Sequence, residues 1–286
     1  MKLAFSTLGC PDFDWPDIYS MAKDLGFDGI EIRGLGKDIF AVRAKPFTEE
    51  ELPNTIRKLQ QLRLEIPCLS SGCCLKFADK ADENHNEIIQ YIELAAKLKT
   101  PYIRILADLE PQPSGEVDDE AVISSLKRLV PIAEEKGVTL LVETNGVYTD
   151  TKRLFNLLNA VGSDAVGALW DIHHPYRFAN ESPGQTVQNL GAYIKYIHIK
   201  DSVMVDGKVS YRMMGEGDLP IDDFIMALQS INYNGYISLE WVKRWAPDLD
   251  DAGVVFPNFA NYMSRYLKKD TRRGRLFTNN AGTGHY

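Results

Sequence analysis

The chain has 286 residues, of which 44% are apolar and 25% are charged, so it has the composition of a globular protein with a sizeable core. Its net charge of −8 disfavours the phosphate backbone of a nucleic acid as a partner. Its N-terminus does not resemble a signal peptide, no apolar stretch is long enough to span a membrane, and its four cysteines are too few for a disulfide framework. We therefore expect reduced thiols, a cytoplasmic location and no membrane partner.

Short β-type runs alternate with longer helical runs along the chain. The expected strands are residues 3–8, 29–33, 66–70, 102–106, 139–143, 166–171, 196–200 and 236–240. The expected helices are a stretch that ends at Gly26, one opened by the capping-box pattern of residues 48–51, one through residues 88–98, and residues 119–136, 149–161, 183–193, 221–234 and 256–267. Pro67 is compatible with a strand only if it stands at the strand's start.

This alternation predicts a parallel sheet covered by helices, because the expected strands are almost continuously apolar. Eight such units fit a closed (β/α)8 TIM barrel in one domain, residues 1–269. The alternative is an open doubly wound sheet, but no glycine-rich dinucleotide turn follows the first strands. We expect residues 270–286 to form a tail outside the barrel, either disordered or packed on the partner subunit of a homo-oligomer.

Four consecutive strands each carry a side chain able to bind a metal at the end where TIM-barrel active sites lie. These side chains are Glu143, Asp171, His198 and Glu240. Each alone could instead cap a helix or form an ion pair. Three converging carboxylates would repel one another without a cation, so together they predict a divalent-metal site. Three carboxylates and one imidazole favour Mn2+ first, with Mg2+, Co2+, Fe2+ and Zn2+ as alternatives.

Around these four residues the sequence resembles the sugar phosphate isomerase/epimerase family, the xylose isomerase-like TIM barrels that include endonuclease IV and the ketose 3-epimerases. The matching motifs are Val142-Glu143, Trp170-Asp171 with His174 three residues later, His198-Ile-Lys-Asp201, Gly215-Glu-Gly217 and Gly235-Tyr-Ile-Ser-Leu-Glu240-Trp. The resemblance implies that the four residues hold one metal and that Glu143 and Glu240 also act as the acid/base pair. It implies substrate contacts from His174 and from an arginine in the loop after the seventh strand, for which Arg212 is the nearest candidate.

Three further side chains are candidates because of their position. Arg104 on the fourth strand is expected to reach either a substrate oxygen or a ligand carboxylate. Lys200 lies two residues after His198 and so faces the same side of the strand, where it either contacts substrate or forms a structural ion pair. Glu31 ends the second strand, where it likewise either contacts substrate or forms a structural ion pair, and it has the same parity as Arg33.

The resemblance leaves several functions open. The leading hypothesis is an isomerase or epimerase of a carbohydrate, polyol or cyclic hydroxy-ketone, which moves a proton through a metal-stabilised enediolate. The alternative is a dehydratase of an inosose or a dehydroshikimate-like substrate. An apurinic endonuclease is disfavoured because that branch needs several more histidines than this chain supplies. A non-catalytic sugar-binding barrel is the remaining hypothesis, and the four ligands alone do not separate these outcomes.

Overall fold

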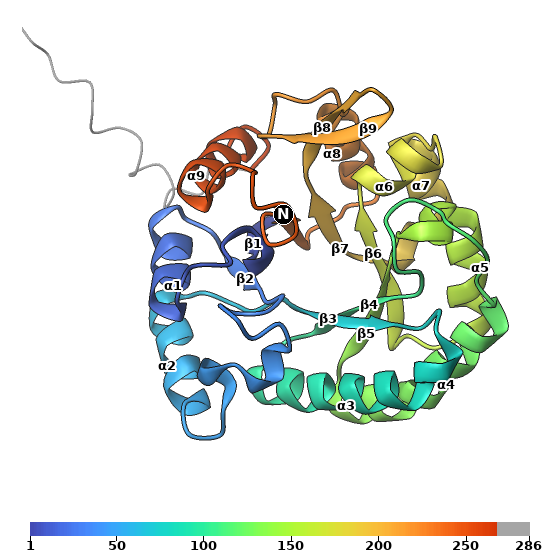
Figure 1. The fold of residues 1–286 in the computed structure, drawn as a ribbon, viewed down its shortest axis with the longest axis horizontal. Helices are drawn as coiled ribbons and strands as arrows, with labels where there is room; N and C mark the ends of the chain where they lie inside the picture. The colour runs from blue at the N-terminus through green and yellow to red at the C-terminus, as the bar shows by residue number, and fades with distance from the viewer. Residues whose placement is uncertain (268–286) are drawn as a thin grey trace, which may run out of the picture.

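The computed structural model describes residues 1–267, which form a single TIM-barrel domain (Figure 1). Eight parallel strands pair in the order β2-β1-β10-β7-β6-β5-β4-β3. The remaining edge, between β2 and β3, is joined by isolated bridges such as Ile32 with Leu69, so the barrel is nearly closed. The barrel strands are β1 (Lys2–Ser6), β2 (Gly29–Glu31), β3 (Cys68–Cys74), β4 (Tyr102–Leu106), β5 (Thr139–Glu143), β6 (Val166–Asp171), β7 (Ile194–Ile199) and β10 (Tyr236–Leu239).

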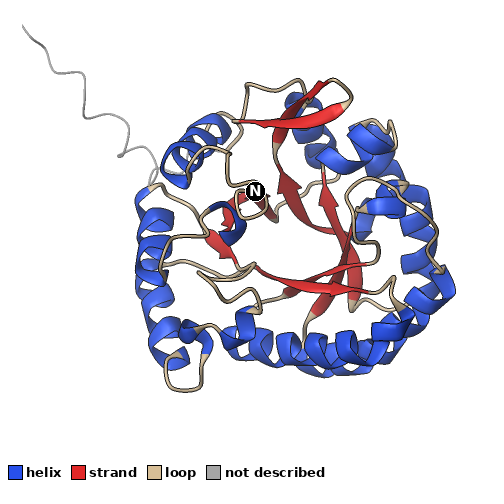
Figure 2. Ribbon diagram, in the orientation of Figure 1, coloured by secondary structure: helices blue, strands red, loops and turns tan. Residues whose placement is uncertain are grey.

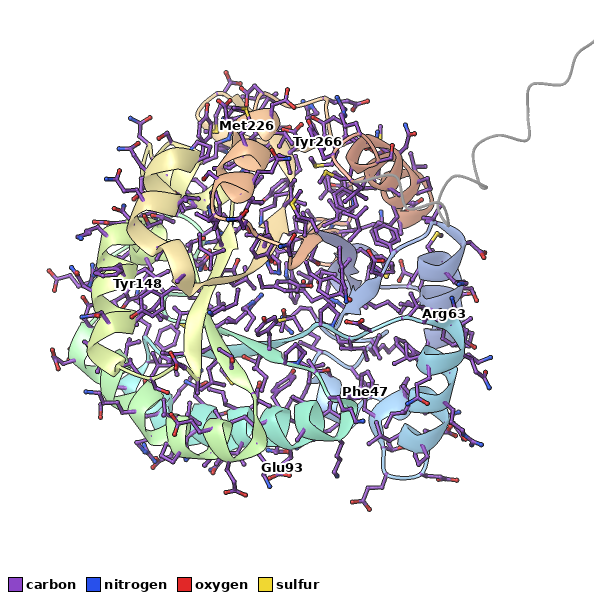
Figure 3. The ribbon with its side chains drawn as sticks, turned by 180° about the vertical axis from the view of Figure 1, so that it is seen from behind. Phe47, Arg63, Glu93, Tyr148, Met226 and Tyr266 are labelled. Carbon is purple, nitrogen blue, oxygen red and sulfur yellow. The ribbon has the colours of Figure 1, made fainter. Side chains whose placement is uncertain are left out.

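Helices surround these strands (Figure 2). Buried apolar side chains of the strands and helices form the main core. The helices are α1 (Trp15–Asp24), α2 (Leu52–Leu62), α3 (Ala81–Leu98), α4 (Asp119–Lys136), α5 (Thr151–Val161), α6 (His173–Phe178), α7 (Pro183–Leu190), α8 (Ile221–Ser230) and α9 (Ala252–Met263). Seen from behind, side chains fill the space between strands and helices, whereas Met226 on α8 points to the outside (Figure 3). No helix among these residues is long and apolar enough to cross a bilayer.

A small apolar layer lies inside the barrel, below the ends of the strands. It consists of Ala4, Cys68, Leu141, Leu169, Tyr196 and Tyr236, with Tyr102 packed against it. Because side chains two residues apart on a strand face the same side, the next inward layer is formed by the residues two positions further on. That layer contains Ser70, Arg104, Glu143, Asp171, His198 and Ser238, so the strand period alone places the polar residues on top of an apolar floor.

The described structure confirms the predicted barrel and differs from the expected elements in a few places. The prediction of a capping box at residues 48–51 is wrong. Helix α2 begins only at Leu52, and the Thr48 hydroxyl donates to the Lys45 carbonyl. Pro67 lies just before Cys68, the first residue of β3, so it interrupts no hydrogen bond within the strand. An antiparallel hairpin of β8 (Asp201–Val205) and β9 (Lys208–Arg212) occupies what was expected to be a loop. The four cysteines are free thiols, and the tail of residues 270–286 lies outside the described residues.

Candidate active site

The four predicted metal ligands come together at the carboxyl ends of neighbouring strands. Glu143 ends β5, Asp171 ends β6, His198 lies on β7 and Glu240 follows β10. Asp171 and His198 are register partners, and the backbone N–H of Glu240 donates to the Ile199 carbonyl. One ligand atom from each of the four residues lies within 4.8 Å of the other three, and all four residues are buried. The two glutamates are the outer members of this row, on either side of the Asp171–His198 pair.

The imidazole of His198 is held from below by Glu31 of β2. Its Nε2 lies 2.9 and 3.0 Å from the two Glu31 carboxylate oxygens, which also accept hydrogen bonds from the Ser70 and Ser238 hydroxyls. A proton on Nε2 leaves the lone pair of Nδ1 directed toward the ligand carboxylates, the second-shell arrangement of metal-bound histidines. Among residues 1–267, Nδ1 has no hydrogen-bond partner, although it lies 3.4 Å from Glu240 Oε1.

The charges of these residues fit a divalent cation. Glu31, Glu143, Asp171 and Glu240 carry four negative charges, and the nearby Arg104 and Lys200 supply two positive charges. In the absence of a metal ion, burial disfavours protonation of His198, but the Glu31 and Glu240 carboxylates outweigh it and raise its pKa well above the ordinary value. With His198 neutral, a divalent ion would balance the two remaining negative charges. Both the unpaired Nδ1 atom and the excess of two negative charges fit the predicted metal ion.

Two buried cations, Arg104 and Lys200, lie against the ligand carboxylates, and Arg104 Nη2 is also 3.9 Å from Glu240 Oε1. Arg104 Nε lies 3.0 Å from Glu143 Oε2 as an ion pair without hydrogen-bond geometry, and Arg104 Nη1 donates to the Ser71 carbonyl. Lys200 Nζ bridges the carboxylates of Asp171 and Glu240. Burial would raise the pKa of Glu143, but Arg104 and His198 hold it at about 2, so this carboxylate is ionised at neutral pH. Of the two alternatives weighed for Arg104 and Lys200, the structure places both cations on ligand carboxylates.

His174 lies beside the four residues, on the first turn of α6. Its Nδ1 is 3.1 Å from the Thr144 carbonyl, and its Nε2 is 3.5 Å from Asp171 Oδ2. Burial lowers its pKa, and Asp171 only partly offsets this effect. The neutral ring therefore donates from Nδ1 to Thr144 and keeps Nε2 available at the site.

Two other predicted contact residues lie elsewhere. Glu31 has no exposed surface, and its two oxygens contact His198, Ser70 and Ser238, so of its two alternatives the structure places it in an ion pair. Arg212 ends β9, where its Nη1 donates to Ser210 Oγ and to the Tyr211 carbonyl. Neither side chain is one of the four converging ligands, because Glu31 contacts Nε2 of His198 and Arg212 belongs to the hairpin.

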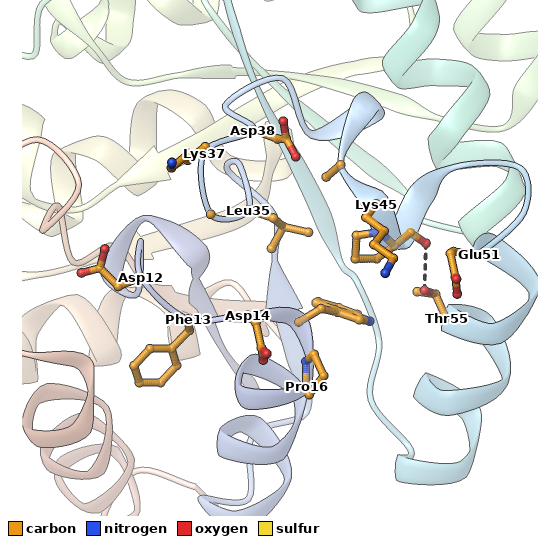
Figure 4. A pocket seen from close by; sticks show the side chains of 14 residues that line it. Asp12, Phe13, Asp14, Pro16, Leu35, Lys37, Asp38, Lys45, Glu51 and Thr55 are labelled. Carbon is orange, nitrogen blue, oxygen red and sulfur yellow. Dashed lines mark hydrogen bonds between the residues drawn. The ribbon is translucent and has the colours of Figure 1, made fainter.

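A large cavity opens beside the barrel mouth, not over the four residues. It measures about 610 Å³ and lies between the start of α1 and the segment that leads into α2 (Figure 4). Phe13 and Asp14 approach from one side, and Lys45 and Thr55 line the other, where the Thr55 hydroxyl donates to the Pro46 carbonyl. The candidate chemistry is located by the converging ligand atoms and not by this cavity, which none of them lines.

Replacing Glu31 with Gln tests the support of His198. The neutral amide is a weaker acceptor for Nε2–H, so we expect the protein to bind Mn2+ roughly 10–100-fold more weakly while the fold is retained. Titration against a chelating dye measures the affinity, and circular dichroism checks the fold. Glu93→Gln, on the exposed face of α3, is the matched control. Unchanged Mn2+ affinity in the Glu31 variant would show that His198 needs no such support.

Comparison with known proteins places the chain in a family. The family model for xylose isomerase-like TIM barrels matches residues 19–255. The chain belongs to this family. No curated protein sequence matches it.

Solved structures of the same fold align with nearly the whole chain at low identity. The zinc-bound IolI protein has a TM-score of 0.75 and 18% identity over 94% of this chain and 100% of its own. The probable 3-DHS dehydratase AsbF from Bacillus anthracis has a TM-score of 0.73 and 19% identity over 92% and 99%. D-Psicose 3-epimerase, determined in the presence of D-fructose, has a TM-score of 0.73 and 18% identity over 93% and 99%. At these identities the likeness establishes the shared fold.

Proposed function

We propose that this protein is a metal-dependent isomerase or epimerase of a sugar or a sugar-like hydroxy-ketone. The observation that carries the proposal is the buried convergence of Glu143, Asp171, His198 and Glu240 within 4.8 Å. The family contains enzymes that act on such compounds, including a D-psicose 3-epimerase and a 3-keto-D-glucoside 4-epimerase among its solved structures. The metal is Mn2+ in our proposal, although the IolI structure of the same fold carries zinc.

A divalent ion bound by these four residues would supply Lewis-acid polarisation of a substrate carbonyl, which acidifies the neighbouring C–H bond. The proton itself is moved by the protein. Glu143 and Glu240 flank the Asp171–His198 pair, so a substrate carbon between them has a carboxylate on each side. One glutamate removes the proton, and the other, or the same one, returns it.

The cationic partners suit this exchange of roles. Arg104 stabilises the ionised form of Glu143, and Lys200 forms an ion pair with the Glu240 carboxylate. Return of the proton to the opposite face of the same carbon is epimerisation. Return to the neighbouring carbon is aldose–ketose isomerisation.

A dehydratase is the second candidate, and the position of Lys200 favours it. This ammonium group lies within the ligand cluster, in contact with Asp171 and Glu240. After a glutamate removes a proton next to the carbonyl, the C–O bond of a β-hydroxyl breaks and the departing hydroxide takes that proton back from the glutamate to leave as water, while the positive charge of Lys200 stabilises the departing group. The same residues then eliminate water where an epimerase returns the proton.

Incubation of the Mn2+-loaded protein with ketohexoses and with an inosose in D2O separates these functions. An isomerase or epimerase incorporates solvent deuterium into a product of unchanged elemental composition. A dehydratase gives a product that has lost one water. Nuclear magnetic resonance and mass spectrometry measure both results. A purified protein without stoichiometric metal, with no chelator-sensitive turnover of any compound in the panel, would contradict the proposal and favour a non-catalytic barrel.

A further inference from the structure

Two arginines at the mouth of the barrel have no acidic partner among residues 1–267. Arg33 follows β2 and is nine-tenths buried, and Arg244 lies in the segment between β10 and α9. Neither forms an ion pair with any carboxylate of the described chain. By contrast, the buried cations of the ligand cluster, Arg104 and Lys200, are both paired. A buried charge without a counter-charge is costly, and such groups concentrate at functional sites.

The side chain of Arg33 lies next to the candidate active site. Arg33 shares the inward parity of Glu31, and its Nη2 would lie 3.3 Å from a Cβ atom added to Gly72 of β3. The preceding residue, Ser71, accepts a hydrogen bond from Arg104, so the two guanidinium groups flank consecutive residues of one strand. Gly72 is exposed although the other residues of β3 are buried, so the strand opens to solvent beside Arg33.

The guanidinium groups of Arg33 and Arg244 each make only one hydrogen bond to residues 1–267. Arg33 makes one long hydrogen bond, 3.4 Å from Nη1 to the Ile39 carbonyl, and lies 5.7 Å from the centre of the half-exposed Trp245 ring. Arg244 donates from Nη1 to the Gly36 carbonyl at 2.8 Å, whereas its buried Nε and Nη2 have no partner. Several N–H donors at the mouth are therefore unused.

The electrostatics also favour an anion. Burial, together with the charges of Arg104 and Arg244, lowers the pKa of Arg33 to about 10, and Tyr91 and Glu87 only partly oppose this effect, so the three cations repel one another across the mouth. Arg33 nevertheless remains protonated at neutral pH. A bound oxyanion would relieve this repulsion and accept the unused N–H donors, and a guanidinium binds carboxylate or phosphate through paired hydrogen bonds.

We propose that Arg33, supported by Arg244, binds an oxyanion of the substrate, so that the enzyme acts on a sugar acid or sugar phosphate in preference to a neutral sugar. The assignment rests on the proposed function, because it places the reacting carbon of the substrate at the four ligands and its anionic group at Arg33. A carboxylate and a phosphate share the chemistry that the two arginines recognise.

Calorimetry on the Mn2+-loaded full-length protein tests this with three six-carbon ketoses that differ at one end. The probes are D-fructose, D-fructose 6-phosphate and D-fructuronate. We expect at least one anionic probe to bind at least about tenfold more tightly than D-fructose, and the better of the two identifies the oxyanion. In Arg33→Gln we expect that advantage to fall roughly 10–100-fold, the worth of hydrogen bonds to a charged group, with D-fructose changed less than about twofold.

Control variants separate anion binding from a structural role of Arg33. Arg43→Gln, an exposed arginine further along the same segment, should leave all three affinities unchanged. If Arg33→Gln does not fold, Gly72→Ala retains every charge but crowds Arg33 Nη2, and should weaken only the anionic probes. No preference of the native protein for either anion, or an equal loss for all three probes in the variant, would overturn the proposal. Anion binding that survives Arg33→Gln would belong to the metal and would overturn it too.

The binding experiment can fail separately from the test of the proposed reaction. Calorimetry measures binding without turnover, whereas the D2O experiment measures proton transfer without reference to Arg33. An anion preference that depends on Arg33 in a protein that exchanges no proton would retain the oxyanion site and reject the reaction. Proton exchange without such a preference would retain the reaction and reject the oxyanion site.

Discussion

Epimerisation or isomerisation should fall roughly 10²–10⁴-fold in Glu240→Gln, because the amide cannot accept or donate the proton in transit. The substitution keeps the size of the side chain and leaves an oxygen near His198 Nδ1, which lies 3.4 Å from Glu240 Oε1 in the native protein. Because a candidate ligand is also changed, the rate is measured at saturating Mn2+ with the metal content determined in parallel. Glu216→Gln, on the exposed loop after β9, is the control and should be as active as the native protein.

A two-base mechanism also predicts which proton each glutamate variant can still exchange. In Glu240→Gln, Glu143 remains ionised and can still remove a proton from its own face of the substrate. One epimer should therefore exchange that proton with D2O without conversion, and Glu143→Gln should show the same behaviour with the other epimer. Retention of more than about a tenth of the native rate by metal-loaded Glu240→Gln would remove this residue from the acid/base pair.

The barrel could be predicted because the strand and helix periods are local properties of the sequence. Apolar strands followed by helices that end at Gly26 and Gly137 leave few alternatives to a parallel barrel. The ligand cluster could be predicted for a related reason. Once the strands are aligned, residues at their carboxyl ends must converge, so Glu143 and Asp171 meet without any knowledge of their contacts.

Contacts between distant strands could not be predicted in the same way. Because Glu31 ends a strand, the sequence left a substrate contact and a structural ion pair both open for it, and its partner His198 is 167 residues away on β7. The depth of a side chain within the barrel, and so whether it meets substrate or supports a ligand, depends on strand stagger. A similar difficulty concealed Arg33 and Arg244, whose significance is that neither forms an ion pair with a carboxylate of residues 1–267.

Some features that were missed had a local signal. Asp206 and Gly207 stand between two short β-type runs, and both have positive φ angles of 50° and 74°. This is the Asp-Gly pattern of a tight hairpin, which β8 and β9 form. The sequence also contained the Gly215-Glu-Gly217 motif, but it did not show why glycine is needed at these positions. The Asp201 carboxylate accepts the backbone N–H groups of Gly215 and Gly217, and a Cβ on Gly217 would collide with it.

Addition of Mn2+ should raise the melting temperature of the metal-free protein by roughly 5–10 °C. At 100 times its dissociation constant, an ion that binds only the folded chain contributes about 2.7 kcal/mol, and each kcal/mol is worth about 2–4 °C in a domain of this size. The physical source is the crowding of Glu143, Asp171 and Glu240, whose mutual repulsion a divalent ion relieves. Differential scanning calorimetry with excess chelator and then with Mn2+ measures the shift in the same preparation.

Asp171→Asn shows whether this shift arises at the proposed site. The amide keeps the size of the side chain and can still accept the His173 backbone N–H, which donates to Asp171 Oδ1, but it removes one of the three anionic ligands. We therefore expect most of the Mn2+-induced shift to disappear, whereas Asp82→Asn, at an exposed pair with Arg128, should retain it. A shift of full size in Asp171→Asn would place the metal elsewhere on the protein. No shift in the native protein would leave Arg104, Lys200 and a protonated His198 as the counter-charges of these carboxylates, and the proton-transfer chemistry proposed above would then have no Lewis acid to drive it.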